Sequence, residues 1–320
     1  MAQYTDFISV NTATKGAKRI GVYNAKGKRM GHIPLASLTP PDTSKMLYSF
    51  GVLSDVHIGQ STATEDFTAA LQFLSKETDF ICIAGDLAHD GNNISLHTEY
   101  KNLVATHATV PVYAIAGNHD GYNANIETLV ESYTGYPLYY TITHSGDVFV
   151  FVGCRSDSNG SLFTAAELTW LANTLEGNKD KRVFLFQHVR PDDACGNALG
   201  IYRYDAWGGA EQTTFENLLR KYPNIVFFHG HSHLKFDLQQ YSDLANIDKT
   251  FGCWSVHVPS ITVPRGTESA VNPSRVELFA ESEGYVVDVY EDGIHLRGRD
   301  FIKGEYLPIA SYWLDTTQQT

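Results

Sequence analysis

Aspartate, histidine and asparagine side chains recur in five short motifs of this chain. The motifs are Asp55-Val-His57, Gly85-Asp86, Gly117-Asn-His-Asp120, the single His188, and Gly230-His-Ser-His233. Imidazole and carboxylate groups together suit divalent ions of the manganese, iron or zinc kind. A carboxylate has two oxygens and can bridge two ions, and an amide oxygen adds a ligand without adding charge. The residue types therefore predict two adjacent metal ions, whose candidate ligands are Asp55, His57, Asp86, Asn118, His188, His231 and His233.

A short apolar run precedes each motif. The runs are residues 47–53, 80–84, 110–116, 183–187 and 225–228. Short apolar runs of this length are typical of buried strands. Open α/β sheets place their functional side chains beyond the carboxyl ends of the strands. We therefore expect the five motifs to meet at one edge of a sheet, although they are far apart in the sequence.

Helical patterns separate these strands. Apolar residues recur at helical spacing over 64–74, 100–104, 126–133, 165–175 and 215–219. Thr164 and Glu167 have the spacing of a capping box. Hairpins are expected over residues 139–152 and 285–297. Strands that alternate with helices, together with late hairpins, predict an α/β fold of two packed mixed β-sheets flanked by helices.

In their order, the five motifs resemble those of the calcineurin-like metallophosphoesterase superfamily. The resemblance covers residues 46–300. It implies an αββα sandwich of the metallo-dependent phosphatase type and a metal-dependent phosphoric ester hydrolase. It also implies that one ion is held by Asp55, His57, Asp86 and His233, and the other by Asp86, Asn118, His188 and His231. Two such ions, divalent or of mixed valence, lower the pKa of a water between them, and the resulting hydroxide attacks phosphorus.

His119 and Asp120 are the candidate catalytic residues. His119 is similar to the non-ligand histidine of the superfamily, which implies that it stabilises the transition state and protonates the leaving oxygen. Asp120 has two interpretations. It orients His119 by accepting its other ring N–H, or it is simply an acidic residue at the start of a helix.

His89 and Arg190 are candidates for contacts with the substrate. His89 lies three residues after Asp86, in a loop that can direct it at the substrate phosphate. In the purple acid phosphatase branch a metal-bound tyrosine has this position, so His89 argues against a coloured enzyme. Arg190 either contacts substrate or lies on the surface. His229, at the end of an apolar run, is expected to be structural.

Composition excludes several classes of function. The net charge of −12 disfavours a surface that holds long nucleic acids. No apolar stretch reaches the roughly 20 residues that span a bilayer, and no secretory signal is visible at the N-terminus. The 4 cysteines are far apart and give no support for a disulfide framework. We expect a cytoplasmic protein.

Residues 1–45 differ from the rest of the chain. They contain seven Lys and Arg residues against two Asp, although the whole chain is acidic. A hairpin is expected from residues 19–23 and 31–35, followed by a stiff linker over 38–42. We interpret 1–45 as an appendage and 46–320, including the C-terminal hairpin, as the metallophosphoesterase domain. The basic segment is either a solvated surface or a docking element for an acidic protein partner.

The leading functional hypothesis is a hydrolase of a small phosphomonoester or phosphodiester, for example a nucleotide or a cyclic nucleotide. The protein phosphatase branch of the superfamily carries an arginine near the third motif, and none follows Asp120 here. One alternative is a nuclease of the same superfamily, which the acidic composition disfavours. The other is an assembly subunit that docks through residues 1–45.

Overall fold

In the computed structural model, the described residues are 19–23, 29–34, 43–155, 162–191, 194–196, 210–236, 246–267, 275–277 and 280–316. In the N-terminal segment, strand β1 (Arg19–Tyr23) pairs antiparallel with β2 (Arg29–Pro34). The predicted linker over 38–42 lies outside the described residues. The division of the chain at residue 45 therefore stays a prediction.

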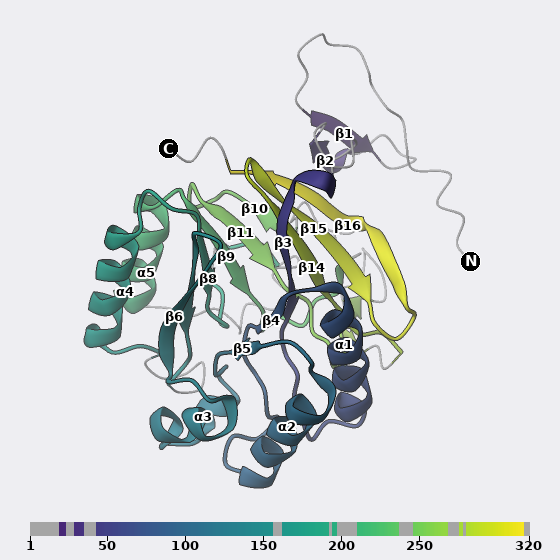
Figure 1. The fold of residues 1–320 in the computed structure, drawn as a ribbon, viewed down its shortest axis with the longest axis vertical. Helices are drawn as coiled ribbons and strands as arrows, with labels where there is room; N and C mark the ends of the chain where they lie inside the picture. Colours follow the sequence, from purple (N-terminus) through teal and green to yellow (C-terminus); the bar gives the residue numbers. More distant parts are fainter. Residues whose placement is uncertain are drawn as a thin grey trace.

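Two six-stranded sheets face each other at the centre of the protein (Figure 1). The first has the order β10 (Ile247–Asp248), β11 (Trp254–His257), β9 (Ile225–His229), β8 (Val183–Phe186), β7 (Asp147–Val152), β6 (Tyr139–His144). The second has the order β16 (Glu305–Asp315), β15 (Gly293–Asp300), β14 (Glu283–Tyr290), β3 (Met46–Leu53), β4 (Phe80–Ile83), β5 (Val112–Ala114). A separate antiparallel pair consists of β12 (Arg265–Thr267) and β13 (Arg275–Glu277). Each large sheet contains both parallel and antiparallel pairs, so both are mixed.

Helices cover the outer face of each sheet (Figure 1). On the second sheet lie α1 (Ala63–Glu77), α2 (Ile94–His107) and α3 (Ile126–Thr134), and on the first lie α4 (Ala165–Gly177) and α5 (Ala210–Lys221). Two 3₁₀ turns are η3 (Thr43–Lys45) and η4 (Asp120–Tyr122). The observed layers confirm the predicted αββα sandwich. No helix among the described residues is long and apolar enough to cross a membrane.

Aromatic side chains fill the space between the two sheets. Phe50 of β3 packs edge-to-face on Phe149 of β7 and Phe184 of β8, with ring centroids 5.2 and 5.1 Å apart. The ring of Phe186 stacks on that of Phe151 with centroids 5.0 Å apart and on that of Phe228 with centroids 5.1 Å apart. These rings are all buried, and close-packed cores allow little movement of one layer on the other. The core therefore fixes where the strand ends of one sheet lie relative to those of the other.

The expected capping box and hairpins are present. Thr164 and Glu167 each accept a backbone amide hydrogen of the other at the start of α4. Strands β6 and β7 form one hairpin and β14 and β15 the second. Strand β16 is not among the expected strands, and its sequence contains Pro308, which removes a ladder donor. It forms the edge of its sheet, where a proline is tolerated.

Candidate metal centre

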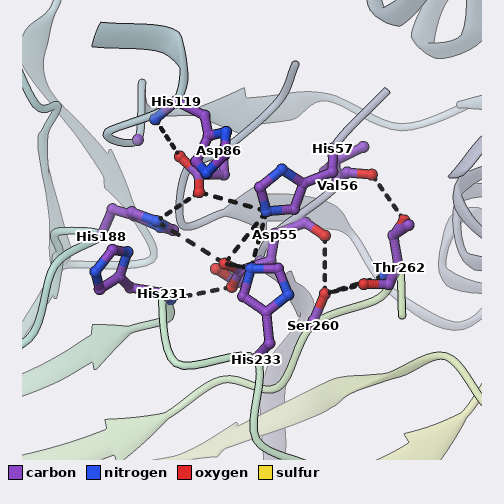
Figure 2. A network of polar contacts seen from close by, with 12 residues as sticks. Asp55, Val56, His57, Asp86, His119, His188, His231, His233, Ser260 and Thr262 are labelled. Carbon is purple, nitrogen blue, oxygen red and sulfur yellow. Dashed lines mark hydrogen bonds and ion pairs between the residues drawn. The ribbon is translucent and has the colours of Figure 1, made fainter. Parts of the chain in front are cut away.

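The predicted ligands gather beyond the carboxyl ends of strands from both sheets (Figure 2). Asp55 and His57 follow β3, Asp86 follows β4, and His188 follows β8. The Nε2 atoms of His57 and His233 are 2.9 Å apart, and Nε2 of His233 lies 3.0 Å from Oδ1 of Asp55. Residues up to 178 positions apart in the sequence thus meet at one edge, as the placement of the motifs predicts.

Asp86 lies between two groups of ligands. Its Oδ2 atom is 3.1 Å from Nε2 of His188 and 3.4 Å from Nε2 of His57. Three sets of side chains have their ligand atoms within 4.8 Å of one another. One consists of His57, His89 and His119, and the other two are Asp55, His57, Asp86, His233 and Asp86, His188, His231. Asp86 belongs to both of the latter sets. This arrangement has the geometry that a carboxylate bridging two ions needs.

Hydrogen bonds orient the candidate ligands. Nδ1 of His188 lies 2.7 Å from the carbonyl oxygen of Ala84, which can only accept, so the ring nitrogen that faces Asp86 is Nε2. The backbone amide of His231 donates to Oδ2 of Asp55 at 3.1 Å, and that of His119 donates to Oδ1 of Asp86 at 2.9 Å. Each carboxylate therefore keeps one oxygen bound to the backbone and turns the other toward the imidazoles.

Buried ligand atoms provide a test of whether metal ions fit this site. Oδ1 of Asn118 is fully buried and accepts no hydrogen bond, and the buried Oδ2 of Asp86 and Nε2 of His188 have no partner besides each other, at 3.1 Å. A buried polar atom in this state is destabilising by about 1–3 kcal/mol unless another partner satisfies it. The amide oxygen, the carboxylate oxygen and the imidazole nitrogen are all ligand atoms that bind divalent ions. The residues present fit a metal centre.

The backbone of the ligand loops is strained. Asp55, His57, Asp86, His231 and His233 all have φ between 48° and 72°. Non-glycine residues rarely adopt this left-handed region, and such strain persists only where the surrounding structure imposes it. Five candidate ligands in one uncommon conformation indicate that the fold holds them for function.

Glycine is required where the loops approach each other. A Cβ atom at Gly85, whose φ is 101°, would lie 2.7 Å from the ring of His188. A Cβ atom at Gly230 would overlap the hydroxyl of Ser54 and lie 2.6 Å from Oδ2 of Asp55. The glycines of the second and fifth motifs thus allow the ligands of different loops to come together.

The pKa values of the ligands reflect burial and their mutual charges. Burial lowers the pKa of His231 and of His233 to about 3, so both rings are neutral at pH 7 and able to bind an ion. Burial also acts to lower the pKa of His188, but the carboxylates of Asp86 and Asp55 outweigh it and raise that pKa to about 9. The pKa of Asp86 is far below its usual value because the imidazoles of His188 and His119 overcome the opposite effect of burial.

We expect added manganese to stabilise the protein. An ion that binds only the folded state at 100 times its dissociation constant contributes about 2.7 kcal/mol to the free energy of unfolding. For a chain of 320 residues the melting temperature should rise by about 4 °C, which calorimetry with and without a chelator measures. The increase should be larger at pH 8 than at pH 6, because the ion has to displace the proton of His188, whose pKa is about 9. An unchanged melting temperature at both pH values would contradict a metal centre.

His119 lies beside the ligands in a pocket. The pocket is lined by His57, Gln60, His89, His119, His233, Thr262, Val263 and Arg265. Nδ1 of His119 lies 2.6 Å from the carbonyl oxygen of His89, and the ring packs edge-to-face on His57 with centroids 4.6 Å apart. A carbonyl can only accept, so Nδ1 carries the hydrogen and Nε2 is the atom available for proton transfer. This geometry suits the predicted role of His119 as an acid.

The structure corrects the predicted role of Asp120. Its carboxylate does not receive the ring N–H of His119, because the carbonyl of His89 takes that position. The carboxylate instead accepts the backbone amides of Leu87, Ala88 and Gly117 at 2.8–3.0 Å. Asp120 also begins η4, in agreement with the alternative of an acidic residue at a helix start. It joins the second motif to the third and acts as a positioning residue.

Replacing Asp120 with alanine should destabilise the protein strongly. The substitution leaves three buried amides without their acceptor, and each such group costs about 1–3 kcal/mol. We expect the free energy of unfolding to fall by about 3 kcal/mol or more in urea titrations. Asp90→Ala is the control, because Asp90 accepts the amide of Asn92 in an exposed loop. Equal effects of the two substitutions would show that the Asp120 contacts do not hold the loops.

The two candidate substrate contacts have different positions. His89 lines the pocket, where it lies 3.0 Å from the amide nitrogen of Gln60 and stacks with His119 at 5.1 Å. Arg190 is fully buried, with 0% exposure, and is not among the residues that line the pocket. Neither substrate contact nor surface location fits Arg190. His229 ends β9 and is buried, as expected for a structural residue.

Sequence reasoning missed the second half of the pocket wall. Gln60, Thr262, Val263 and Arg265 line the pocket, yet none belongs to the five motifs. The only local signal was the position of Gln60 three residues after His57. Thr262, Val263 and Arg265 belong to a segment that reaches the pocket through long-range contacts, and no local sequence pattern predicts such contacts.

Comparison with protein families gives one match. The sequence profile of the family described as calcineurin-like phosphoesterase matches residues 48–235, which include all seven candidate ligands. No curated protein matches. The C-terminal part, which contains Thr262, Val263 and Arg265, lies beyond the matched residues.

Solved structures share the fold at low sequence identity. Purple acid phosphatase PPD1 from yellow lupin (Lupinus luteus) has a TM-score of 0.56 and 12% identity, over 93% of this chain and 59% of that chain. GAP50, the anchor in the inner membrane complex of Plasmodium, has a TM-score of 0.53 and 15% identity, over 86% of this chain and 91% of that chain. This chain therefore spans about 59% of the length of the lupin protein. At these identities the two structures support the fold alone.

Proposed function

Because this chain belongs to the calcineurin-like phosphoesterase family, we propose that it hydrolyses a small phosphate ester with two metal ions bound around Asp86. The observation that carries the proposal is the set of buried ligand atoms of Asp86, Asn118 and His188, which have no hydrogen-bond partner outside the set. An uncompensated set of this kind is destabilising in a protein that binds no cation. Phosphomonoesters and phosphodiesters, such as nucleotides and cyclic nucleotides, are the proposed substrate classes.

Each side chain of the centre has a proposed task. Asp55, His57, Asp86 and His233 would hold one ion, and Asp86, Asn118, His188 and His231 the other. When bound, two ions of the manganese, iron or zinc kind supply a hydroxide nucleophile and neutralise charge on the phosphoryl group. The backbone bonds at Asp55, Asp86 and His188 keep the ligand atoms in place during turnover.

His119 would act on the leaving group. Its hydrogen bond to the carbonyl of His89 fixes the ring and leaves Nε2 as the atom that gives up a proton. The ring lines the same pocket as the ligands His57 and His233. A proton delivered there neutralises the charge that develops on the departing oxygen, an effect that contributes about 10²–10⁴-fold to the rate.

The two alternatives account for less of the site. A nuclease has to hold a long polyanion, and the chain carries a net charge of −12. GAP50 has the same fold and is described as an anchor. An assembly subunit, however, has no need of strained loops that direct buried carboxylates and imidazoles at one another. Docking of a partner through residues 1–45 is compatible with an active enzyme and is a separate proposal.

The proposal is tested with two chromogenic esters. The full chain, loaded with manganese, should hydrolyse p-nitrophenyl phosphate, bis(p-nitrophenyl) phosphate or both, and a chelator should abolish the activity. Metal analysis should give two ions per chain. A protein that contains two ions per chain and turns over neither ester would contradict the proposed function.

A further inference from the structure

Residues 260–265, which lie beyond the residues that the family profile matches, form hydrogen bonds with the loops that carry the candidate ligands. We call residues 260–265 the pocket strap. The amide of Ile261 donates to the carbonyl of Ser54 at 3.1 Å, and the hydroxyl of Thr262 donates to the carbonyl of Val56 at 2.7 Å. The hydroxyl of Ser260 lies 3.1 Å from the carbonyl oxygen of Asp55 (Figure 2). Three consecutive residues of the first motif's loop thus bind the start of the strap.

The other end of the strap binds the loop of the fifth motif. The amide of Arg265 donates to the carbonyl of His233 at 2.7 Å, and the amide of Lys235 donates to the carbonyl of Arg265 at 3.1 Å. These contacts place the strap between the loops of Asp55 and His233, whose side chains meet at 3.0 Å. The position of Arg265 is therefore set by the same backbone that sets the ligands.

Backbone strain marks the middle of the strap. Val263 has φ 53°, in the left-handed region that a β-branched residue adopts only under constraint. Outside the candidate ligands and the glycines, the only other described residue with positive φ is Ser145, in a hairpin turn. Strained conformations of this kind cluster at sites that bind ligands. The hydrogen bonds at both ends of the strap supply the constraint.

The strap brings a permanent positive charge to the pocket. Thr262, Val263 and Arg265 line it together with four histidines and Gln60, and no acidic residue is among these lining residues. A planar guanidinium forms paired, charge-assisted hydrogen bonds with phosphoryl oxygens.

We infer that Arg265 is a substrate-binding residue that contacts the phosphoryl group and favours phosphomonoesters. The inference rests on the proposed function and names the substrate class of the same site. A phosphomonoester dianion has three non-bridging oxygens and two negative charges, whereas a diester has two oxygens and one charge. An additional fixed cation in the pocket stabilises the dianion more than the monoanion, because the Coulomb attraction grows with the charge.

The test measures binding rather than turnover, with two matched probes. Phenylphosphonate is a dianion at pH 8 with three such oxygens, and methyl phenylphosphonate is a monoanion with two. Calorimetric titration of the manganese-loaded full chain should show that Arg265→Gln weakens phenylphosphonate binding about 10–100-fold. Binding of methyl phenylphosphonate should weaken by a clearly smaller factor. Arg265→Lys, which keeps the charge but loses the planar fork, should give an intermediate loss.

The control and the metal content make each outcome decisive. Arg220→Gln removes the same charge from the exposed surface of α5, where Arg220 pairs with Glu216, and should leave both affinities unchanged. Metal content should equal that of the wild type in all variants.

Unchanged phenylphosphonate affinity in both Arg265 variants would overturn the inference and leave the proposed function intact. Equal losses for both probes would overturn the preference for monoesters. A metal-loaded wild type that binds neither probe would overturn both proposals.

Discussion

Asp86→Asn should reduce kcat for p-nitrophenyl phosphate by at least about 10³-fold and lower the metal content below two ions per chain. The expected loss corresponds to the several kcal/mol that metal ions contribute to transition-state stabilisation. Asp86 is the residue on which the effect should be largest, because it belongs to both groups of candidate ligands. Steady-state kinetics and elemental analysis of the same preparations provide the two measurements.

Asparagine tests the charge of Asp86 without removing its structural contact. Oδ1 accepts the amide of His119 at 2.9 Å, and the amide oxygen of asparagine can take that position. The amide nitrogen would then face Nε2 of His188 and of His57, where the wild type has Oδ2. It carries no negative charge and donates hydrogen bonds, so it cannot bind a cation.

Asp79→Asn is the matched control for this substitution. Asp79 precedes the other end of β4, where its carboxylate accepts the amide of Ser49 at 2.9 Å. Its neutralisation should leave both metal content and kcat within about twofold of the wild type, because isolated surface substitutions change little. Two ions and wild-type turnover in Asp86→Asn would show that Asp86 does not bridge.

His119→Gln should lower kcat by about 10²–10⁴-fold at unchanged metal content. The ring lines the pocket and its Nδ1 is bound to the carbonyl of His89, so Nε2 is the group that the substitution removes. Glutamine keeps a side chain that donates hydrogen bonds but cannot act as an acid. The combination of lost turnover and retained metal separates His119 from the ligands, whose substitution should remove both.

The leaving group provides a second readout for His119. An alkyl phosphate has a poor leaving group that needs protonation, whereas p-nitrophenolate leaves with little assistance. The variant should therefore lose more activity with an alkyl phosphate than with p-nitrophenyl phosphate. His97→Gln is a suitable control, because His97 is buried beside Tyr133 and lies outside the pocket. An equal loss with both esters would indicate that His119 positions the substrate and does not donate the proton.

Much of the fold could be predicted because its signals are local. Buried parallel strands are continuous apolar runs in the sequence. The ends of β3, β4, β8 and β9 agree with the ends of the predicted apolar runs to within two residues. Strand β16 is not among the expected strands; its proline contradicts the usual strand pattern, and only its place at a sheet edge makes that residue acceptable.

The sequence by itself determined the types of the candidate ligands and their placement after strands. Both are properties of a few neighbouring residues. A parallel sheet then brings the side chains that follow different strands close together at one edge. The tertiary structure alone decided the partner of each polar group. Asp120 binds the amides of Leu87 and Ala88 and not the ring of His119, and Arg190 is buried. Residues 260–265 reach the pocket because they bind backbone groups about 200 positions away. Such contacts depend on where loops of different strands meet, and that position is set by packing of the whole core.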